Sequence, residues 1–413
     1  MAERKWVMTG KEINRYCVVR EAMEGGLTVK EAAMELSLSE RQVCRIKKAV
    51  RDRGHMAVIH GNRGRPPSIR KSLALRERIK LLYQNKYGGF NVSHFTEKLV
   101  RDEGIEVSRE TVRKELMCCG LITKAKKPKH RQRRERMPKE GMLLQMDTSE
   151  HDWLMGRGPH MELIASIDDA TNEVPYALFV ESDNTINNML VMKEIVERKG
   201  IPLGFYVDGA SHFFTTRHGG THIRIKEEQE ETQIERAIKE LGSNLIPAGS
   251  PQAKGRIERL FGTFQDRLVS EMNLREISNF EEANNFLHRE FLQDYNERFT
   301  KAPQMTESAY IPLPQGERLD GIFCLKYPRI VRADNTISYK SRVFQILPSP
   351  TRIGYTRAKV EVQEWLDGSI HVRYKNQELS IKEIPGDDGR RTPVRLDFNG
   401  FLEKTLKAES VKA

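Results

Sequence analysis

The spacing of hydrophobic and polar residues is most regular in the middle of the chain. Between residues 141 and 299, short apolar runs of strand length alternate with segments whose apolar residues recur every three to four positions, the period of a helix. The pattern predicts strands at 142–147, 161–168, 174–180, 203–207 and 244–247, and helices at 185–198, 234–241, 250–268 and 280–298. Three consecutive strands followed by alternating helices and strands imply a mixed sheet with flanking helices.

The regions on either side of this core have simpler patterns. Before residue 124 the apolar positions follow a helical period, and from 321 to 385 they alternate over short segments, which predicts a small β-barrel. We therefore expect a multidomain α/β protein. Its predicted parts are helical domains at 1–54 and 71–123, linkers at 55–70, 124–140 and 300–320, the mixed core at 141–299, the barrel at 321–385 and a mobile tail at 386–413. The Gly, Pro and Arg residues of 55–70 predict that this linker holds no regular element.

Three acidic residues of the core fall at defined structural positions. Two apolar runs stop on Asp147 and Asp208, so we expect both at strand ends, and Ser250 starts a helix that carries Glu258 on its second turn. Hard divalent cations prefer carboxylate oxygens, and three acids in one place are hard to stabilise without cations. The trio therefore predicts a metal site for phosphodiester chemistry. Because the chain has 58 acidic residues, spacing alone proves little; the flanking strand and helix patterns give the trio its weight.

Charge is distributed unevenly along the chain, whose net charge is +11. Residues 1–140 hold 34 Lys and Arg against 17 Asp and Glu, whereas the rest of the chain holds 35 against 41. A basic front part joined to a mildly acidic remainder suggests that one part holds a polyanion and the other coordinates cations. The natural polyanion is double-stranded DNA.

Two helix pairs in the basic part have the form of helix-turn-helix units. In the first, Thr28 and Ser39 cap successive helices; in the second, Ser93 and Ser108 do so. The outward residues predicted to contact DNA are Arg41, Gln42, Arg45 and Lys47 in the first unit and Arg109, Arg113 and Lys114 in the second. The alternative for the first unit is an ordinary helical hairpin with a solvated charged face. The second could instead pack against the first or mediate dimer contacts.

Basic residues outside the helix pairs are further candidates for DNA contact. Arg63 and Arg65 resemble the core of an AT-hook, which inserts arginine into a narrow minor groove, although a plain linker is the simpler interpretation. Residues 124–136 hold eight Lys and Arg and predict phosphate contacts. The residues singled out there are Lys126, Lys127, Arg133 and Arg134. Lys254 and Arg256, next to Glu258, are assigned to positioning a DNA end, with a solvated helix face as the alternative.

At these residues the sequence resembles the DDE transposases of bacterial insertion sequences, most closely the ISNCY-type group, which shares the retroviral integrase core. The segments SPQAKGRIERLFGTFQDRL (250–268), MDTSEHDW (146–153) and LIASIDDAT (163–171) carry the resemblance. Two departures affect DNA-end contacts. The interval from Asp208 to Glu258 is longer than in retroviral cores and includes the acidic segment 227–235, and Gln265 stands where many relatives have a basic residue.

The resemblance implies a ribonuclease-H-like core in which the first strand lies beside the fourth, so that Asp147 and Asp208 meet and Glu258 arrives from its helix. These three residues are then both catalytic and metal ligands, holding two Mg²⁺ or Mn²⁺ ions. The implied activity is cleavage of DNA ends to a 3′-OH and joining of that 3′-OH to target DNA, by a dimer or tetramer. Asp168 and Asp169 are possible competitors for the ligand role, but the resemblance leaves them structural.

Two alternatives from other classes stay open: a catalytically silent regulator that binds DNA, and a nuclease of the same fold that cuts without joining. The chain has no run of eighteen apolar residues and no secretory signal, and its five cysteines form no CxxC pair. We therefore expect a cytoplasmic, nucleoid-associated protein without a zinc module. His212, His218 and His222 are interpreted as polar loop residues.

Overall fold

The computed structural model describes residues 7–63, 71–123, 135–214, 231–249, 254–314, 316, 318–349, 352–375 and 377–384. The chain divides into two compact units, residues 1–77 and 78–413.

The first unit is helical. It contains α1 (Gly10–Glu24), α2 (Val29–Leu36), α3 (Glu40–Arg53) and the short 3-10 helix η1 (Gly54–Val58). The side chains of Thr28 and Ser39 accept hydrogen bonds from the backbone N–H groups of the first turns of α2 and α3, as predicted. Helix η1 overlaps the segment 55–70, so the prediction that this segment holds no regular element is wrong at its start. Val58 explains the difference, because its buried side chain packs with Val19 and Val50.

The second unit contains another helical group, formed by α4 (Leu73–Asn85, whose start belongs to the first unit), α5 (Val92–Arg101) and α6 (Arg109–Cys118). Ser108 caps α6 as predicted. The predicted cap of α5 is wrong: the helix starts earlier because the Asn91 side chain accepts a hydrogen bond from the His94 N–H at 2.9 Å. Ser93 instead accepts a hydrogen bond from Arg109.

A five-stranded mixed sheet forms the centre of the second unit, with the order β3-β2-β1-β4-β5. Its strands are β1 (Leu144–His151), β2 (Met161–Asp168), β3 (Ala177–Val180), β4 (Gly204–Val207) and β5 (Asn244–Pro247). Strands β1, β2 and β3 pair antiparallel, whereas β4 runs parallel to both β1 and β5. The predicted mixed sheet is therefore confirmed, and so is the expectation that the first strand lies beside the fourth.

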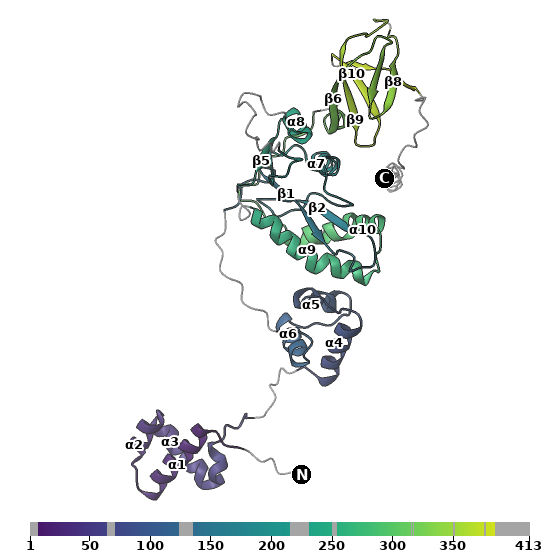
Figure 1. Cartoon of the computed structure of the whole chain (residues 1–413). Coiled ribbons are helices and arrows are strands. Elements are labelled where there is room, and N and C mark those ends of the chain that lie inside the picture. Colours follow the sequence, from purple (N-terminus) through teal and green to yellow (C-terminus); the bar gives the residue numbers. More distant parts are fainter. Residues whose placement is uncertain are drawn as a thin grey trace, which may run out of the picture. The chain divides into compact units, whose positions relative to one another are not determined.

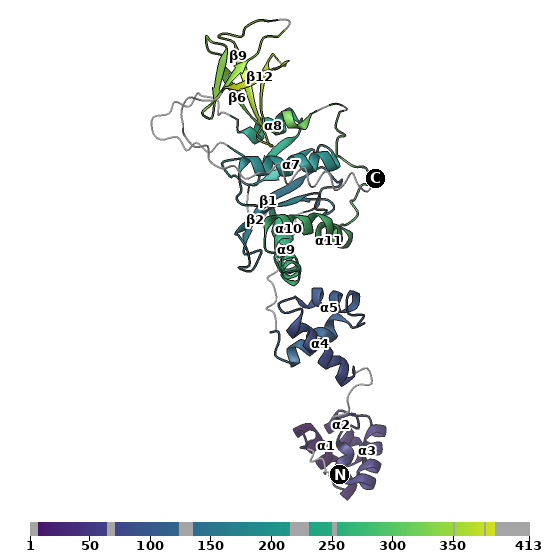
Figure 2. The same ribbon diagram turned by 90° about the vertical axis from the view of Figure 1, so that its right-hand side faces the viewer.

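Helices cover both faces of this sheet (Figures 1 and 2). One face carries α7 (Thr185–Lys199) and α8 (Gln233–Glu240); the other carries α9 (Gly255–Leu274), α10 (Phe280–Phe286), the π-helical turn η3 (Leu287–Phe291) and α11 (Leu292–Phe299). Successive strand residues point to opposite faces. Leu144 and Met146 of β1 therefore pack on the α7 side, while Leu163 and Ala165 of β2 pack beneath α9.

Side chains from α10 to α11 close the outer edge of β3. The Asn284 amide donates to the carbonyl oxygen of Phe179 and accepts from its N–H, and Asn296 does the same for Val174. His288, on the π-helical turn, hydrogen bonds to the Ala177 carbonyl oxygen at 2.7 Å. Unpaired strand edges invite pairing with other chains, and these side chains occupy the edge instead. Asn296 also explains why β3 starts later than residue 174, the predicted start.

The C-terminal part of the second unit is built from short strands after the 3-10 turn η4 (Leu319–Gly321). They are β6 (Cys324–Ile330), β7 (Thr336–Tyr339), β8 (Arg342–Ile346), β9 (Lys359–Trp365), β10 (Ile370–Tyr374), β11 (Gln377–Leu379) and β12 (Ile381–Ile384). They form a four-stranded sheet, β11-β10-β9-β6, and a three-stranded sheet, β12-β8-β7, around one apolar core. Lys340 and Ser341 both have positive φ, which suits the tight turn between β7 and β8.

Candidate active site

Asp147 and Asp208 occupy equivalent positions on neighbouring parallel strands. Strand β1 pairs with β4 at Leu144–Phe205 and Gln145–Tyr206, and each Asp lies two residues beyond the last pair. Asp208 directly follows β4, as predicted. Asp147, however, lies in the middle of β1, so the prediction of a strand end is wrong there. The strand continues to His151 because β2 still pairs with it after β4 has diverged.

The environment of Asp147 combines burial with two charged neighbours. Burial raises the pKa of Asp147 above its ordinary value, the ammonium of Lys254 opposes this rise, and the negative charge of Asp208 adds to it. The Ala210 N–H donates to Asp208 Oδ1 at 3.0 Å and the Thr148 N–H to Asp147 Oδ1 at 3.1 Å. Two carboxylates on neighbouring strands supply the oxygen donors that a hard divalent cation prefers.

Lys254 places a positive charge beside Asp147. Its side chain is only 7% exposed, and its Nζ lies 3.1 Å from Asp147 Oδ1. A buried ammonium is stable only when it is paired, so Asp147 and Lys254 stabilise each other's charge.

Glu258 lies on the first turn of α9 and is exposed. The prediction placed it on the second turn of a helix that starts at Ser250; the structure starts α9 at Gly255, and residues 250–253 lie outside the described residues. Within the described part of the chain, no three His, Cys, Asp or Glu side chains are grouped closely enough to hold a metal ion. The structure therefore brings Asp147 and Asp208 onto neighbouring strands, and it does not gather them with Glu258 into a ready-made three-residue metal site.

A buried polar bridge fixes the start of α9 against the sheet. Gln145, two residues before Asp147 on the same face of β1, donates to Asp169 Oδ1 at 2.7 Å and accepts from the Ile257 N–H at 3.3 Å. Arg256 donates to the Asp169 carboxylate at 2.9 Å and to the Glu135 carbonyl oxygen at 3.0 Å. The bridge determines where the first turn of α9, and with it Glu258, meets β1.

The sequence analysis missed the role of Gln145. The available signal was a polar residue inside an apolar strand, on the face that also carries Asp147. Ser149, two residues after Asp147, accepts a hydrogen bond from Gln265. Gln265, which stands where many relatives have a basic residue, therefore has a hydrogen-bond partner on β1.

Asp168 does not compete for a ligand role in this structure. It is buried, and its carboxylate accepts hydrogen bonds from the N–H groups of Gly141, Ala170 and Thr171 and from the Thr171 hydroxyl. Asp169 is engaged by Gln145 and Arg256 as described above. Both acids hold backbone and side chains in place.

The predicted DNA-binding residues of the first unit differ in their availability. Arg41 and Arg45 are exposed on α3. The Gln42 side chain accepts a hydrogen bond from the Ser39 N–H, which completes the cap of α3, and Lys47 donates to the Ala22 carbonyl oxygen at 2.7 Å. Arg63 is paired with Glu12.

In the second unit the candidates also have intramolecular partners. Arg113 and Lys114 both face Glu110, and hydrogen bonds from Arg113 lower the pKa of Glu110 to about 2. The structure buries Lys254 and Arg256, which were expected on an accessible helix face. Five predicted DNA contacts and two of the loop histidines lie outside the described residues: Arg65, Lys126, Lys127, Arg133, Arg134, His218 and His222. His212 is described and lies 3.7 Å from Asp183.

Fold and site define a mixed α/β protein with a pair of carboxylates on adjacent parallel strands, and comparisons with known proteins place it in a family. The chain is 31% identical over 401 residues to the "Putative transposase y4bF" of Sinorhizobium fredii, a match covering 97% of this chain and 86% of that protein. It is 30% identical over 414 residues to the transposase for insertion sequence IS1202 of Streptococcus pneumoniae, covering 90% of this chain and 86% of that protein. The chain belongs to this family of insertion-sequence transposases.

Two other comparisons add less. No family model matches the chain. A chain in the solved structure of a simian T-cell lymphotropic virus intasome, in complex with PP2A regulatory subunit B56 gamma, is 11% identical with a TM-score of 0.33. That match covers 75% of this chain and 99% of the viral structure's chain, and at this TM-score it is a partial likeness only. Among the described residues, no helix is both long and apolar enough to pass through a membrane.

Proposed function

We propose that this protein is a DDE-type transposase that binds the ends of a mobile DNA element, cleaves them to give a 3′-OH and joins that 3′-OH to target DNA. The observation that carries the proposal is the register of Asp147 and Asp208 on parallel neighbouring strands, in a chain that aligns with transposases over most of its length. The strand order and the helices on both faces support a ribonuclease-H-like core at 141–299.

Asp147, Asp208 and Glu258 are the proposed ligands of two Mg²⁺ or Mn²⁺ ions. The oxygen-only donor set fits such cations, and the negative charge of Asp208 adds to the raised pKa of Asp147. When bound, the metal supplies Lewis-acid activation of the attacking oxygen and stabilises the leaving 3′ oxygen.

The chain's own residues prepare this site. The buried ammonium of Lys254 balances the charge of Asp147 and is a proposed donor to a phosphate oxygen of the DNA end. Gln145 and Arg256 hold the first turn of α9, so the position of Glu258 is set by buried hydrogen bonds.

The remaining parts are assigned to DNA binding and assembly. Helix-turn-helix units at 1–54 and 71–123 read the terminal repeats, with Arg41 and Arg45 as the most available contacts. The basic segment 124–140 adds phosphate contacts. The small β-barrel at 321–385 is the proposed C-terminal domain. A dimer or tetramer pairs two ends on the nucleoid.

A joining assay tests this proposal. The full chain is incubated with Mg²⁺ or Mn²⁺, a plasmid target and labelled duplexes copied from the DNA that flanks its gene. We expect Asp208→Asn and Glu258→Gln each to reduce joined product by roughly 1000-fold, a loss of about 4 kcal/mol of transition-state stabilisation. Glu281→Gln, an exposed glutamate on α10, is the matched control and keeps wild-type activity.

The reaction products distinguish a transposase from the two alternative classes of protein. Cleavage without joining by the wild-type chain identifies a nuclease. Binding without either reaction identifies a silent regulator. Full activity of Glu258→Gln overturns its assignment as a ligand.

A further inference from the structure

One face of α5 is attached to α9 by polar and charged side chains. His94, Lys98 and Arg101 of α5 lie one or two helical turns apart, and His94 and Lys98 are almost fully buried, with side chains 5% and 4% exposed. A lysine is seldom buried unless it is paired. Their burial shows that this face of α5 is an interface.

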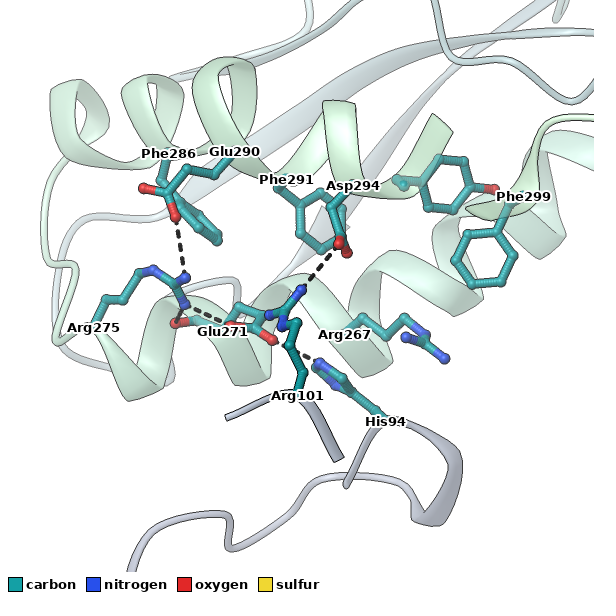
Figure 3. Close-up of a pocket in the computed structure, with 11 residues that line it drawn as sticks. His94, Arg101, Arg267, Glu271, Arg275, Phe286, Glu290, Phe291, Asp294 and Phe299 are labelled. Carbon is teal, nitrogen blue, oxygen red and sulfur yellow. Dashed lines mark hydrogen bonds and ion pairs between the residues drawn. The ribbon is translucent and has the colours of Figure 1, made fainter. Parts of the chain in front are cut away.

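Glu271 of α9 is the centre of the contact. Its carboxylate accepts from His94 Nε2 at 2.7 Å and lies 2.8 Å from Lys98 Nζ. Arg275, one turn further along α9, donates to Glu271 at 2.5 Å. Figure 3 shows His94 and Arg101 reaching toward α9 and α11 from the α5 side.

Three outer ion pairs surround this centre. Glu97 of α5 binds Arg267 of α9 through two contacts, at 2.7 and 2.9 Å, and Arg298 of α11 at 2.6 Å. Arg101 lies 3.1 Å from Asp294 of α11. Each of the carboxylates Glu97, Glu271 and Asp294 therefore contacts at least one cationic side chain from the opposite side of the interface between α5 and the helices α9 and α11.

The contacts that join α5 to α9 in the described residues are polar and charged. Among the described residues, the apolar core beneath α9 includes no side chain of α5. A cavity of about 310 Å³ remains between the helices, bordered by the rings of Phe286, Phe291 and Phe299. The attachment depends on charge, and outer pairs of this kind weaken as salt rises.

The attached helix lies next to α6, whereas α9 carries Glu258 at its other end. Thirteen residues separate Glu258 from Glu271, roughly 20 Å along a helix. Arg109 and Lys114 of α6 remain exposed while α5 is docked. The α5 interface and the outward face of α6 are therefore distinct surfaces.

We propose that the contact between α5 and α9 acts as a spacer, which holds α6 at a fixed distance from the carboxylates of the core. The phosphodiester bond that is cleaved would then lie at a fixed distance along the DNA from the sequence that α6 recognises. This inference rests on the proposed function. It assigns Glu97 and Glu271 as positioning residues that do not touch DNA.

Spin-label distances test the docking without DNA or metal. The labels are placed on native Cys119, at the end of α6, and on Glu281→Cys of α10, in a full chain with Cys17, Cys44 and Cys118 changed to serine. The parent chain is expected to give one narrow distance distribution. Glu97→Arg and Glu271→Lys, which break the contact by independent routes, are expected to broaden it, and Arg267→Glu in the Glu97→Arg chain to narrow it again. Glu106→Lys, an exposed acid of the same helical group, is the matched control.

Mapping of the cut position tests the consequence. On labelled duplexes copied from the DNA that flanks the gene, cleavage at the wild-type position is expected to fall about 100-fold in Glu97→Arg and Glu271→Lys, with new cuts at neighbouring phosphates. Glu106→Lys keeps the single position.

The outcomes are separable. A narrow distance in both disrupting variants overturns the docking contact. A broad distance with an unchanged cut position overturns the spacer role. A wild-type chain that binds but never cuts ends the proposed function and the spacer with it, whereas the distances still report whether α5 docks.

Discussion

At the scale of single residues, the polar bridge under α9 shows how buried hydrogen bonds position a site. Gln145 is fully buried and uses both ends of its amide, toward Asp169 and toward the Ile257 N–H. Replacing Gln145 by an apolar residue of similar size removes one hydrogen bond from the buried Asp169 carboxylate and one from the buried Ile257 N–H.

We predict that Gln145→Leu lowers the free energy of unfolding by about 3 kcal/mol, because a buried N–H and a buried carboxylate each lose a partner. The measurement is urea unfolding of the full chain. Gln293→Leu, at an exposed position of α11, is the control and changes the free energy of unfolding by less than about 0.5 kcal/mol. An equal effect in both variants would show that the amide of Gln145 is not part of a stabilising bridge.

At the scale of helices, charge holds α5 to α9, and this dependence is visible in the titration of Glu271. Burial alone raises the pKa of Glu271, but hydrogen bonds from His94 and Lys98 outweigh burial and hold the pKa far below its ordinary value. A depressed folded-state pKa means that the carboxylate contributes stability above its unfolded pKa, about 4.3, and loses it as the pH falls below that value.

We therefore predict that acid destabilises the wild-type chain more than Glu271→Gln. Between pH 7 and pH 3 the wild-type free energy of unfolding falls further, because only the wild type must protonate this carboxylate. Denaturant unfolding at each pH gives the two curves. Glu281→Gln, whose carboxylate is exposed, is expected to follow the wild type; parallel curves for wild type and Glu271→Gln would contradict the prediction.

At the scale of the whole molecule, the distribution of charge separates a basic front part from a mildly acidic remainder. Binding to DNA phosphates releases counterions, so the logarithm of the affinity falls linearly with the logarithm of the salt concentration. The slope of that line is proportional to the number of phosphate contacts. Arg41 and Arg45 are exposed on α3 and so are available for such contacts.

We predict that changing both Arg41 and Arg45 to alanine reduces the slope of log affinity against log salt by about two. The measurement is fluorescence anisotropy with a labelled duplex over a salt series. The matched control changes Arg20 and Arg198 to alanine; each is paired with a glutamate on its own helix, and the slope stays as in wild type. Equal slopes for both double variants would remove α3 from the DNA interface.

Local patterns were sufficient to predict the elements. The strands at 161–168 and 244–247 match the structure residue for residue, and the caps at Thr28, Ser39 and Ser108 are confirmed. Two of the errors lie where a distant residue decides: β1 runs past Asp147 because β2 pairs with it there, and β3 starts late because Asn296 takes the hydrogen bonds of Val174. The error at the start of α5 is local, because the adjacent Asn91 caps that helix. The placement of Asp208 after β4 followed from its local run.

The sequence by itself determined the order of helices and strands, the mixed sheet, the uneven charge and the resemblance to transposases, because these depend on neighbouring residues and on composition. Only the tertiary structure decided which side chains meet. It joined Gln145 to α9, buried Lys254 against Asp147 and docked α5 on Glu271. The physical reason is separation: these partners lie from 107 to 177 positions apart along the chain, and no local pattern records which distant group will satisfy a buried charge or amide.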